Sequence, residues 1–360
     1  MNTLVRITII IGIFCWSIQA KNDTKCRALV LSATTDKGAY HAGVFDSIAK
    51  KADDPSEFEY DVVVGASIGG FNAAIIAKHP PGDEKAAADD LVNLWSTLGR
   101  EHVYNFWSGG YVNGALFKMS LVDSSPFQNF LWNKFNPPFK RKLVVGASNS
   151  NTGEYDTFYE TDLPQIDDVI MLLSSTTAIP LYFPSVNWKE TSYFDGSLLH
   201  SADIESAIHR CIEQGHNETD IIIDIITTHN GLPVPFSAQN YKTLKVFVRA
   251  LEISLYASES LQLYKARKEH PEVHFRYIFQ PSEVLPGTMN PLSFDHEDMA
   301  EDIKIGQKDG EAVLKTGKFG NGAELIEKAT EWLQKTHGIF GKGVQTVKEI
   351  NQRLREKQIE

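Results

Sequence analysis

Residues 61–78 read DVVVGASIGGFNAAIIAK and contain the strongest structural signal of the chain. Its first four residues predict a buried strand, and Gly70–Lys78, rich in Ala and Ile, predicts a helix. Between them stands Gly65-Ala66-Ser67-Ile68-Gly69, a G-x-S-x-G pattern in the strand–turn–helix context that such a turn requires. A turn this sharp needs small residues beside the serine, and it lifts the hydroxyl above the sheet, near the helix N-terminus. The pattern therefore predicts an activated serine nucleophile at Ser67.

Outward from this stretch, short apolar runs alternate with helical periods along the chain. This alternation is typical of βα units and predicts an α/β fold with a mainly parallel central sheet. The predicted strands are Ala28–Ser32, Asp61–Val64, Lys142–Gly146, Tyr193–Phe194, Asp220–Thr227 and Val273–Gln280. The predicted helices are Ala39–Lys51, Gly70–Lys78, Leu91–Leu98, Asp167–Ser175, Ala202–Gln214, Thr243–Arg267 and Met299–Lys315.

Composition narrows the class of protein. The chain has 360 residues, of which 42% are hydrophobic and 22% charged, so it can bury a sizeable core. Its formal net charge of −11 argues against a nucleic-acid partner, because binding a phosphate backbone needs a basic footprint. After the first twenty residues, no run of apolar residues is long enough to predict a transmembrane helix.

The first twenty residues have the layout of a secretory signal peptide. Arg6 supplies a positive charge, Ile7–Trp16 is mostly apolar, and a small residue, Ala20, stands before the polar sequence that follows. A membrane anchor is the rival interpretation, but the apolar run is too short to span a bilayer. Two N-x-[ST] sites, at Asn22 and Asn217, agree with secretion. We expect a mature chain that is secreted or enters a luminal endomembrane compartment.

Removal of residues 1–20 leaves two cysteines, Cys26 and Cys211. An oxidising compartment permits a disulfide between them. Cys211, however, lies in a helical pattern with Ala207 and Ile208, which favours a buried free thiol. The cysteine spacing alone does not establish which of the two holds.

A serine nucleophile needs a base, and the sequence offers two kinds of candidate. The usual triad places a histidine after the serine and the acid. The histidines considered for this role all follow Ser67, and the residues around each give no sign of a catalytic function: His200, His209, His216, His229, His270, His274 and His296. Asp195 differs, because it ends a short strand and is followed by Gly196, whose backbone freedom suits a tight turn. A carboxylate there can act as the base if burial raises its pKa; the alternative is that Asp195 only shapes the turn.

Three blocks of the sequence together resemble the patatin-like phospholipases, a family of Ser–Asp acyl hydrolases. They are residues 28–44, residues 61–74 with the G-x-S-x-G turn, and residues 174–197, which end in Asp195-Gly196-Ser197. The resemblance implies a three-layer α/β/α fold with a phospholipase domain over residues 21–320. It also implies that Ser67 is the nucleophile and that Asp195, in the family's D-G-[GA] motif, is its base. Ser197 departs mildly from that motif.

A more serious departure concerns the family's Gly-rich loop, G-G-G-x-[KR]-G, whose N–H groups form the oxyanion hole. Ala33, Thr34 and Thr35 replace its three glycines, and only Lys37 and Gly38 match. Loss of one oxyanion donor reduces the rate by about 10²–10³-fold. The Ile68 amide and the threonine hydroxyls are alternative donors. The degenerate hole predicted from the resemblance comprises Ala33, Thr34, Thr35, Asp36, Lys37, Gly38 and Ile68.

Three functional hypotheses follow. The first is a lipid acyl hydrolase that cleaves phospholipid or other acyl-lipid esters, at a membrane or micelle surface, through Ser67, Asp195 and an acyl-enzyme. It needs no metal or organic cofactor, and the sequence has no His/Cys cluster with zinc spacing. The second is a weak or inactive lipid-binding protein of the same fold, motivated by Ala33-Thr34-Thr35. The third is an ordinary Ser-His-Asp esterase, which needs a histidine close to Ser67.

Two further segments each have two possible structural roles. Residues 104–140 are rich in aromatic side chains, which indicates either packing in the core or a hydrophobic lid or acyl-chain pocket. Residues 321–360 are expected to form a C-terminal helical extension. Within that extension, apolar residues at helical spacing in Gly341–Glu360 suit a helix packed on the body or one lying on a membrane surface.

Overall fold

The computed structural model describes residues 25–229, 239, 242–287 and 292–316. The predicted signal peptide, residues 1–20, lies outside the described residues. The predicted C-terminal extension, residues 321–360, does so as well.

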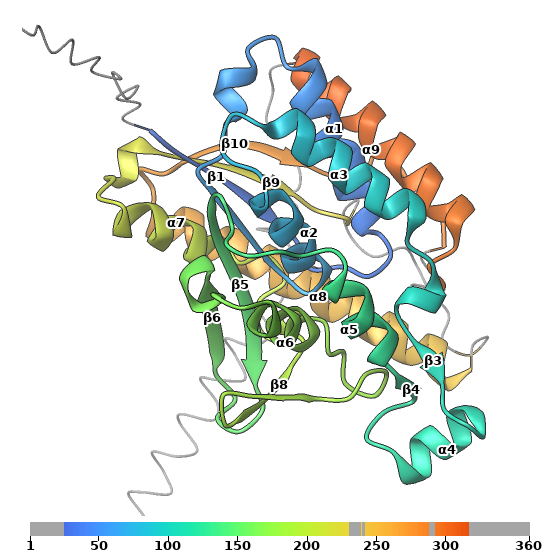
Figure 1. Ribbon diagram of the computed structural model, residues 1–360. Helices are drawn as coiled ribbons and strands as arrows, with labels where there is room; N and C mark the ends of the chain where they lie inside the picture. Colours follow the sequence, from blue (N-terminus) through green and yellow to red (C-terminus); the bar gives the residue numbers. More distant parts are fainter. Residues whose placement is uncertain (1–24, 230–238, 240–241, 288–291, 317–360) are drawn as a thin grey trace, which may run out of the picture.

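The central sheet has eight strands, in the order β10-β9-β1-β2-β5-β8-β7, with β6 also paired to β5 (Figure 1). The first five strands of that order run parallel, whereas β6, β7 and β8 pair antiparallel. The strands are β1 (Cys26–Leu31), β2 (Val62–Ala66), β5 (Lys142–Asn149), β6 (Tyr155–Tyr159), β7 (Val186–Trp188), β8 (Thr191–Phe194), β9 (Ile221–Ile226) and β10 (His274–Phe279). The expected α/β fold with a mainly parallel sheet is therefore confirmed.

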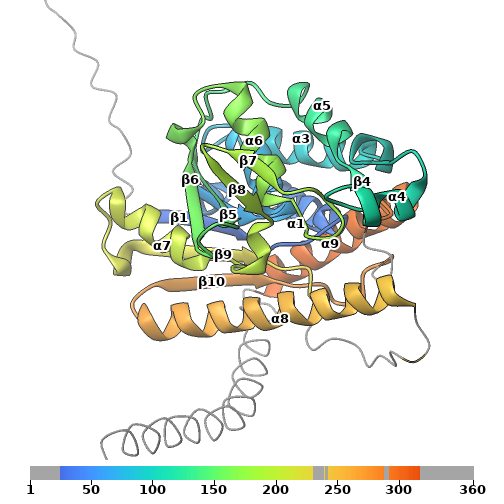
Figure 2. The same cartoon turned by 90° about the horizontal axis from the view of Figure 1, so that it is seen from below.

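Helices cover both faces of the sheet, and alternation along β1 shows why. Leu29 and Leu31 join one apolar cluster, whereas Ala28 and Val30 join a second cluster on the other face. Successive side chains of a strand point to opposite faces, so a strand apolar at every position needs a cover on both sides. The first face is covered by α1 (Gly38–Lys51), α2 (Ile68–Ala77), α3 (Glu84–Thr97), α6 (Ile166–Thr176) and α9 (His296–Thr316). The second face carries α7 (Ile204–Glu213) and α8 (Thr243–Glu269), as Figure 2 shows.

The predicted strands and helices are all present, most of them within three residues of the predicted ends. The exception is α3, which begins at Glu84, seven residues before the predicted helix at Leu91. The sequence pattern missed several elements between residues 104 and 188, because elements of two to eight residues are too short to give a clear periodic signal. They are β3 (Asn105–Phe106), α4 (Gly110–Phe117), β4 (Val122–Asp123), α5 (Ser125–Trp132), β6 and β7.

The aromatic-rich segment divides between the two alternatives. Phe135 is buried in the core, and Phe127 is buried beside the pocket described below. Phe117, in contrast, is exposed on α4.

The interpretation of Cys211 as a free thiol is wrong. Cys26 and Cys211 form a disulfide with a Cα–Cα distance of 5.8 Å, which joins the start of β1 to α7. The apolar face of α7 predicted from Ala207 and Ile208 is indeed buried, but it packs on the β1 face that presents Cys26. Helical periodicity indicates that a cysteine is buried; it does not reveal which distant residue lies against it.

Within the described ranges, no helix combines the length and the apolar character needed to cross a bilayer.

Candidate active site

Ser67 stands on a sharp turn between the end of β2 and the start of α2. Its backbone angles, φ 53° and ψ −136°, are unusual for a non-glycine residue and are typical of strain held in place at functional sites. The turn is possible because its neighbours are small: a Cβ on Gly69 would collide with the backbone carbonyls of Leu31 and Ser32. The strand–turn–helix geometry predicted from the sequence is therefore present.

Asp195 meets Ser67 from a distant part of the chain. The Ser67 hydroxyl donates a hydrogen bond of 2.8 Å to Oδ2 of Asp195, and both side chains are buried. Asp195 directly follows β8, and β8 pairs with β5, the strand beside β2. Sheet order thus brings together two residues that are 128 positions apart.

The Asp195 side chain is held on its second oxygen as well. The Ser197 N–H donates to Oδ1 at 2.8 Å, and the Ser148 hydroxyl donates to the Asp195 carbonyl at 2.9 Å. Burial raises the pKa of Asp195 from 3.8 to about 6, against the lowering effect of the hydrogen bonds from Ser197 and Ser67. A carboxylate with that pKa is a far better proton acceptor than a solvent-exposed aspartate.

Gly196 is needed for a different reason from the expected one. Its φ does not lie in the left-handed region, so backbone freedom does not explain it. A Cβ there would instead collide with the Gly146 carbonyl and approach Ala66. The glycine therefore allows the loop that carries Asp195 to lie close against β5 and the end of β2.

No histidine among the described residues hydrogen-bonds to Ser67. The Ser67 hydroxyl has two acceptors, Asp195 and the Thr34 carbonyl, and the Asp195 carboxylate is bonded to Ser67 and Ser197. The histidines that follow Ser67 have other partners where partners are seen: His229 pairs with Glu259, and His270 with Glu205 and Glu218. The Ser-His-Asp hypothesis therefore has no support in this geometry.

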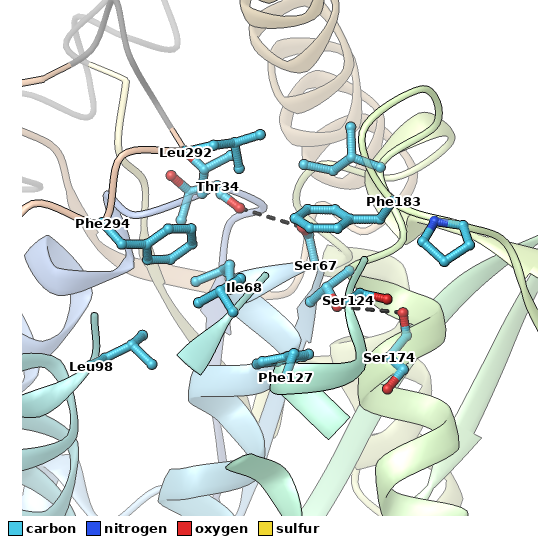
Figure 3. A pocket seen from close by; sticks show the side chains of 15 residues that line it. Thr34, Ser67, Ile68, Leu98, Ser124, Phe127, Ser174, Phe183, Leu292 and Phe294 are labelled. Atoms are coloured by element: carbon cyan, nitrogen blue, oxygen red, sulfur yellow. Dashed lines mark hydrogen bonds between the residues drawn. The ribbon is translucent and has the colours of Figure 1, made fainter. Parts of the chain in front are cut away.

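The degenerate Gly-rich loop points an acceptor at the nucleophile where a donor is expected. The Thr34 carbonyl lies 3.3 Å from the Ser67 hydroxyl and accepts a hydrogen bond from it, as Figure 3 shows. The Ala33 N–H is already bonded to the Ser201 carbonyl at 2.6 Å. The Thr35 hydroxyl is engaged, because it donates to Asp36. The Thr34 hydroxyl accepts from Thr228 and keeps its own proton, so it stays a candidate donor at the pocket wall.

The remaining residues of the loop build the scaffold. Lys37 is buried and pairs with Asp36 at 3.3 Å and with Asp302 of α9 at 3.2 Å. Burial raises the pKa of Asp36, and it raises the pKa of Asp302 to about 7. Gly38 begins α1, where a Cβ would collide with Ile68 and Trp95. Asp36, Lys37 and Gly38 thus anchor α1 and α9, and none of them lines the pocket around Ser67.

Of the oxyanion donors predicted from the sequence, the Ile68 N–H is the best placed. It is the first residue of α2 and lines the pocket beside Ser67. The first N–H groups of a helix have no intrahelical acceptor, and the helix dipole favours negative charge there. The Ser67 N–H itself is occupied, since it donates to the Thr176 hydroxyl at 2.8 Å.

Thr176 is a buried residue that the sequence did not single out. Its hydroxyl accepts from the Ser67 N–H and donates to the Gly146 carbonyl at 2.6 Å, so it ties the strained turn to β5. A threonine at the end of a predicted helix carries no local sign of this role. Only the packing of α6 against β5 reveals it.

Replacing Thr176 with Val is expected to lower the free energy of unfolding by about 1–3 kcal/mol, because a buried N–H and a buried carbonyl each lose a partner. Thr176→Ser keeps the hydroxyl and is the matched control. Urea denaturation of both variants measures the effect. Equal stability of the Val and Ser variants would show that the hydroxyl does not hold the turn.

The pocket above Ser67 is mostly apolar. Apolar side chains from several elements surround the nucleophile (Figure 3). They include Ile68, Leu98, Val103, Phe127, Ile179, Phe183, Leu292 and Phe294. Ser174 also lines the pocket, and its buried hydroxyl has no partner within the described part of the chain. Such a pocket suits an acyl chain, with a polar group left over for a substrate oxygen.

The described residues contain no group of three or more His, Cys, Asp or Glu side chains that could hold a metal ion.

Comparison with known proteins identifies the family. The model of the family described as patatin-like phospholipase matches residues 29–208, half of the chain, including Ser67 and Asp195. Comparison with curated protein sequences gave no significant match. Among solved structures, VipD from Legionella pneumophila aligns over 91% of this chain and 77% of that chain, with 14% identity and a TM-score of 0.39, a score too low to add to the argument. On the strength of the family model, the chain belongs to the patatin-like phospholipase family.

Proposed function

We propose that this family member hydrolyses acyl-lipid esters through Ser67 and Asp195. The Ser67 oxygen attacks the ester carbonyl carbon while Asp195 takes the hydroxyl proton. The bond to the alcohol then breaks, and Asp195 returns the proton to the leaving oxygen. Water, deprotonated by the same carboxylate, next attacks the acyl-enzyme. The bond between the acyl group and Ser67 breaks, and Asp195 returns the proton to the serine oxygen, which releases the fatty acid and free Ser67. The observation that carries the proposal is the 2.8 Å hydrogen bond from Ser67 to a buried carboxylate.

The substrate class follows from the pocket. Apolar walls around Ser67 favour a long acyl chain, and the family as a whole acts on lipids. We propose phospholipids or neutral acyl lipids, met at a membrane or micelle surface. The pocket residues do not discriminate between head groups, because Ser124, Ser174 and Thr177 are its main polar side chains beyond the loop and Ser67.

The test is covalent labelling of the folded mature chain with a fluorescent fluorophosphonate. Labelling should occur in the wild type and be lost in Ser67→Ala. Ser174→Ala is the matched control, because Ser174 lines the same pocket without a hydrogen bond to Asp195, and this variant should still be labelled. A well-folded wild-type protein that takes no label would contradict the proposal that the protein is a hydrolase.

A second candidate function is lipid binding without turnover, and one observation favours it. The Thr34 carbonyl faces Ser67 where an oxyanion donor is expected, so the transition state lacks at least one hydrogen bond. Wild type that binds radiolabelled phospholipid, releases no fatty acid and takes no fluorophosphonate would establish this second function. Released fatty acid that depends on Ser67 would exclude it.

Activity should depend on pH through Asp195. The base must be ionised to accept the Ser67 proton, and burial raises its pKa to about 6. We therefore expect kcat/KM to be flat above that pH and to fall about tenfold for each pH unit below it. Hydrolysis of a soluble short-chain nitrophenyl ester between pH 4.5 and 8.5 measures the profile. A profile that stays flat down to pH 4.5 would mean that the base titrates as an exposed aspartate.

We also propose that the mature chain enters an oxidising compartment. The Cys26–Cys211 disulfide supports this, because disulfides persist in secreted and luminal proteins and are rare in reducing compartments. N-terminal sequencing of the native protein should begin at Lys21. A native protein that retains residues 1–20 would contradict the predicted cleavage.

A further inference from the structure

An apolar arm projects from the body beside α5. It consists of β3, α4, β4 and the segments that join them, residues 104–123 (Figure 1). Of the eight residues of α4 only Gly114 is buried. Four large apolar side chains are more than two thirds exposed: Val112 69%, Leu116 69%, Phe117 77% and Met119 73%. Several exposed large apolar side chains on a small projecting element are typical of an interaction surface.

The charge of the arm is unlike that of the rest of the chain. The protein contains 46 Asp and Glu residues and has a formal net charge of −11, yet residues 102–122 contain neither Asp nor Glu. The cation of this stretch is Lys118, whose ammonium lies 5.1 Å from the centre of the Trp107 ring. At the base, the Arg100 guanidinium lies 5.5 Å from the Phe106 ring. Aromatic side chains close to Lys or Arg are typical of surfaces that lie at a membrane–water interface.

The arm is continuous with the pocket that contains Ser67. Phe183 lines the pocket and contacts Tyr104, whose ring contacts Phe106, whose ring in turn contacts Tyr111 of α4; the ring centres are 6.1, 5.8 and 5.0 Å apart. The Tyr104 hydroxyl also donates to the carbonyl of Leu292, another pocket residue, at 3.0 Å. A series of ring contacts therefore joins Tyr111 of α4 to the wall of the pocket that contains Ser67.

We propose that residues 104–123 form the surface by which the protein docks on a lipid bilayer, with Leu116, Phe117 and Met119 inserted among the acyl chains. The inference rests on the proposed function, since docking through the arm would bring the pocket that contains Ser67 close to the acyl lipids of the bilayer. The absence of Asp and Glu between residues 102 and 122 lets this one face approach anionic lipids that repel the remainder of an acidic protein. A bilayer therefore accounts for the apolar tip, the charge of the arm and its connection to the pocket together.

The test measures vesicle binding separately from catalysis. The mature chain carrying Ser67→Ala, which cannot turn over substrate, is floated with vesicles of phosphatidylcholine alone or mixed with phosphatidylglycerol. Adding Leu116→Ser and Phe117→Ser should reduce the bound fraction at least about tenfold, because two exposed apolar side chains no longer enter the bilayer. Binding should be stronger on the anionic vesicles.

The matched control carries Ile212→Ser and Leu261→Ser on the same background. Both side chains are apolar and exposed, at 39% and 45%. Ile212 lies on α7, at the opposite end of the molecule from α4 in both views (Figures 1 and 2). Leu261 lies on α8, which covers the second face of the sheet. This variant should bind vesicles as tightly as its parent.

Several outcomes would overturn the docking surface. The arm variant could bind vesicles as well as the control variant does, or the parent could bind none. Light scattering could also show a dimer that the arm substitutions convert to a monomer.

Hydrolysis of a soluble ester distinguishes failure of the docking surface from failure of the proposed function. In the chain with Ser67 intact, the arm variant should hydrolyse the soluble ester at the wild-type rate while losing activity on vesicles. Arm-dependent vesicle binding without any ester hydrolysis would retain the docking surface and reject the hydrolase.

Discussion

Replacing Asp195 with Asn is expected to lower kcat/KM for ester hydrolysis by about 10²–10⁴-fold, the contribution typical of a general base. The amide can still accept from the Ser197 N–H, as Oδ1 does in the wild type at 2.8 Å. It cannot accept the proton of Ser67, and its NH₂ group would donate to the serine oxygen. The turn is thus preserved while the proton acceptor is removed. Initial rates on a soluble nitrophenyl ester measure the loss.

Stability provides the control for that variant. Burial raises the folded pKa of Asp195 to about 6, above its value near 3.9 in an unfolded chain. An acid whose pKa is raised by folding destabilises the folded state when it is ionised, so the wild type loses stability as pH rises from about 4 to 6. Asp195→Asn should therefore melt at the same or a higher temperature than wild type at pH 8, and the advantage should shrink at pH 4.5. A variant that is inactive and also melts well below wild type at pH 8 would attribute the loss to misfolding.

Replacing Thr35 with Gly is expected to raise kcat/KM by about 10²–10³-fold, the effect of one oxyanion donor. The Thr34 carbonyl now points at the Ser67 hydroxyl. Rotating the peptide bond between Thr34 and Thr35 turns that carbonyl away and brings the Thr35 N–H toward the reacting centre. The rotation changes ψ of Thr34 and φ of Thr35 together and carries φ of Thr35 into the left-handed region. Glycine enters that region freely, whereas a β-branched threonine is strained there.

Thr35→Ala is the matched control, because it removes the same hydroxyl and methyl groups without adding the backbone freedom of glycine. It should have nearly the wild-type rate. Rates of fluorophosphonate labelling, followed in parallel with ester hydrolysis, show whether the gain arises at the acylation step. Equal rates for the Gly and Ala variants would contradict the peptide rotation and indicate that Ile68 alone supports the oxyanion.

Part of the site could be predicted because it is encoded locally. Ser67 stands between small residues, after an apolar strand and before an Ala-rich helix. This local pattern is enough to predict the sharp turn at Ser67 from residues 61–78 alone. The sequence shows Asp195 as a carboxylate at the end of a strand, followed by glycine. It does not show how close Asp195 lies to Ser67. The family resemblance supplied the pairing, which the 2.8 Å hydrogen bond now describes in atomic terms.

The α/β fold, its parallel strands and the turn at Ser67 follow from local sequence patterns, because periodicity and small residues act within a few positions of one another. The folded chain alone reveals that Cys26 meets Cys211, that Thr176 accepts from the Ser67 N–H, and that the Thr34 carbonyl faces the nucleophile. It also decided that the short elements of residues 104–123 form an exposed arm beside the pocket. These contacts join residues far apart in the chain or depend on the orientation of a single peptide, and neither property leaves a periodic pattern in the sequence.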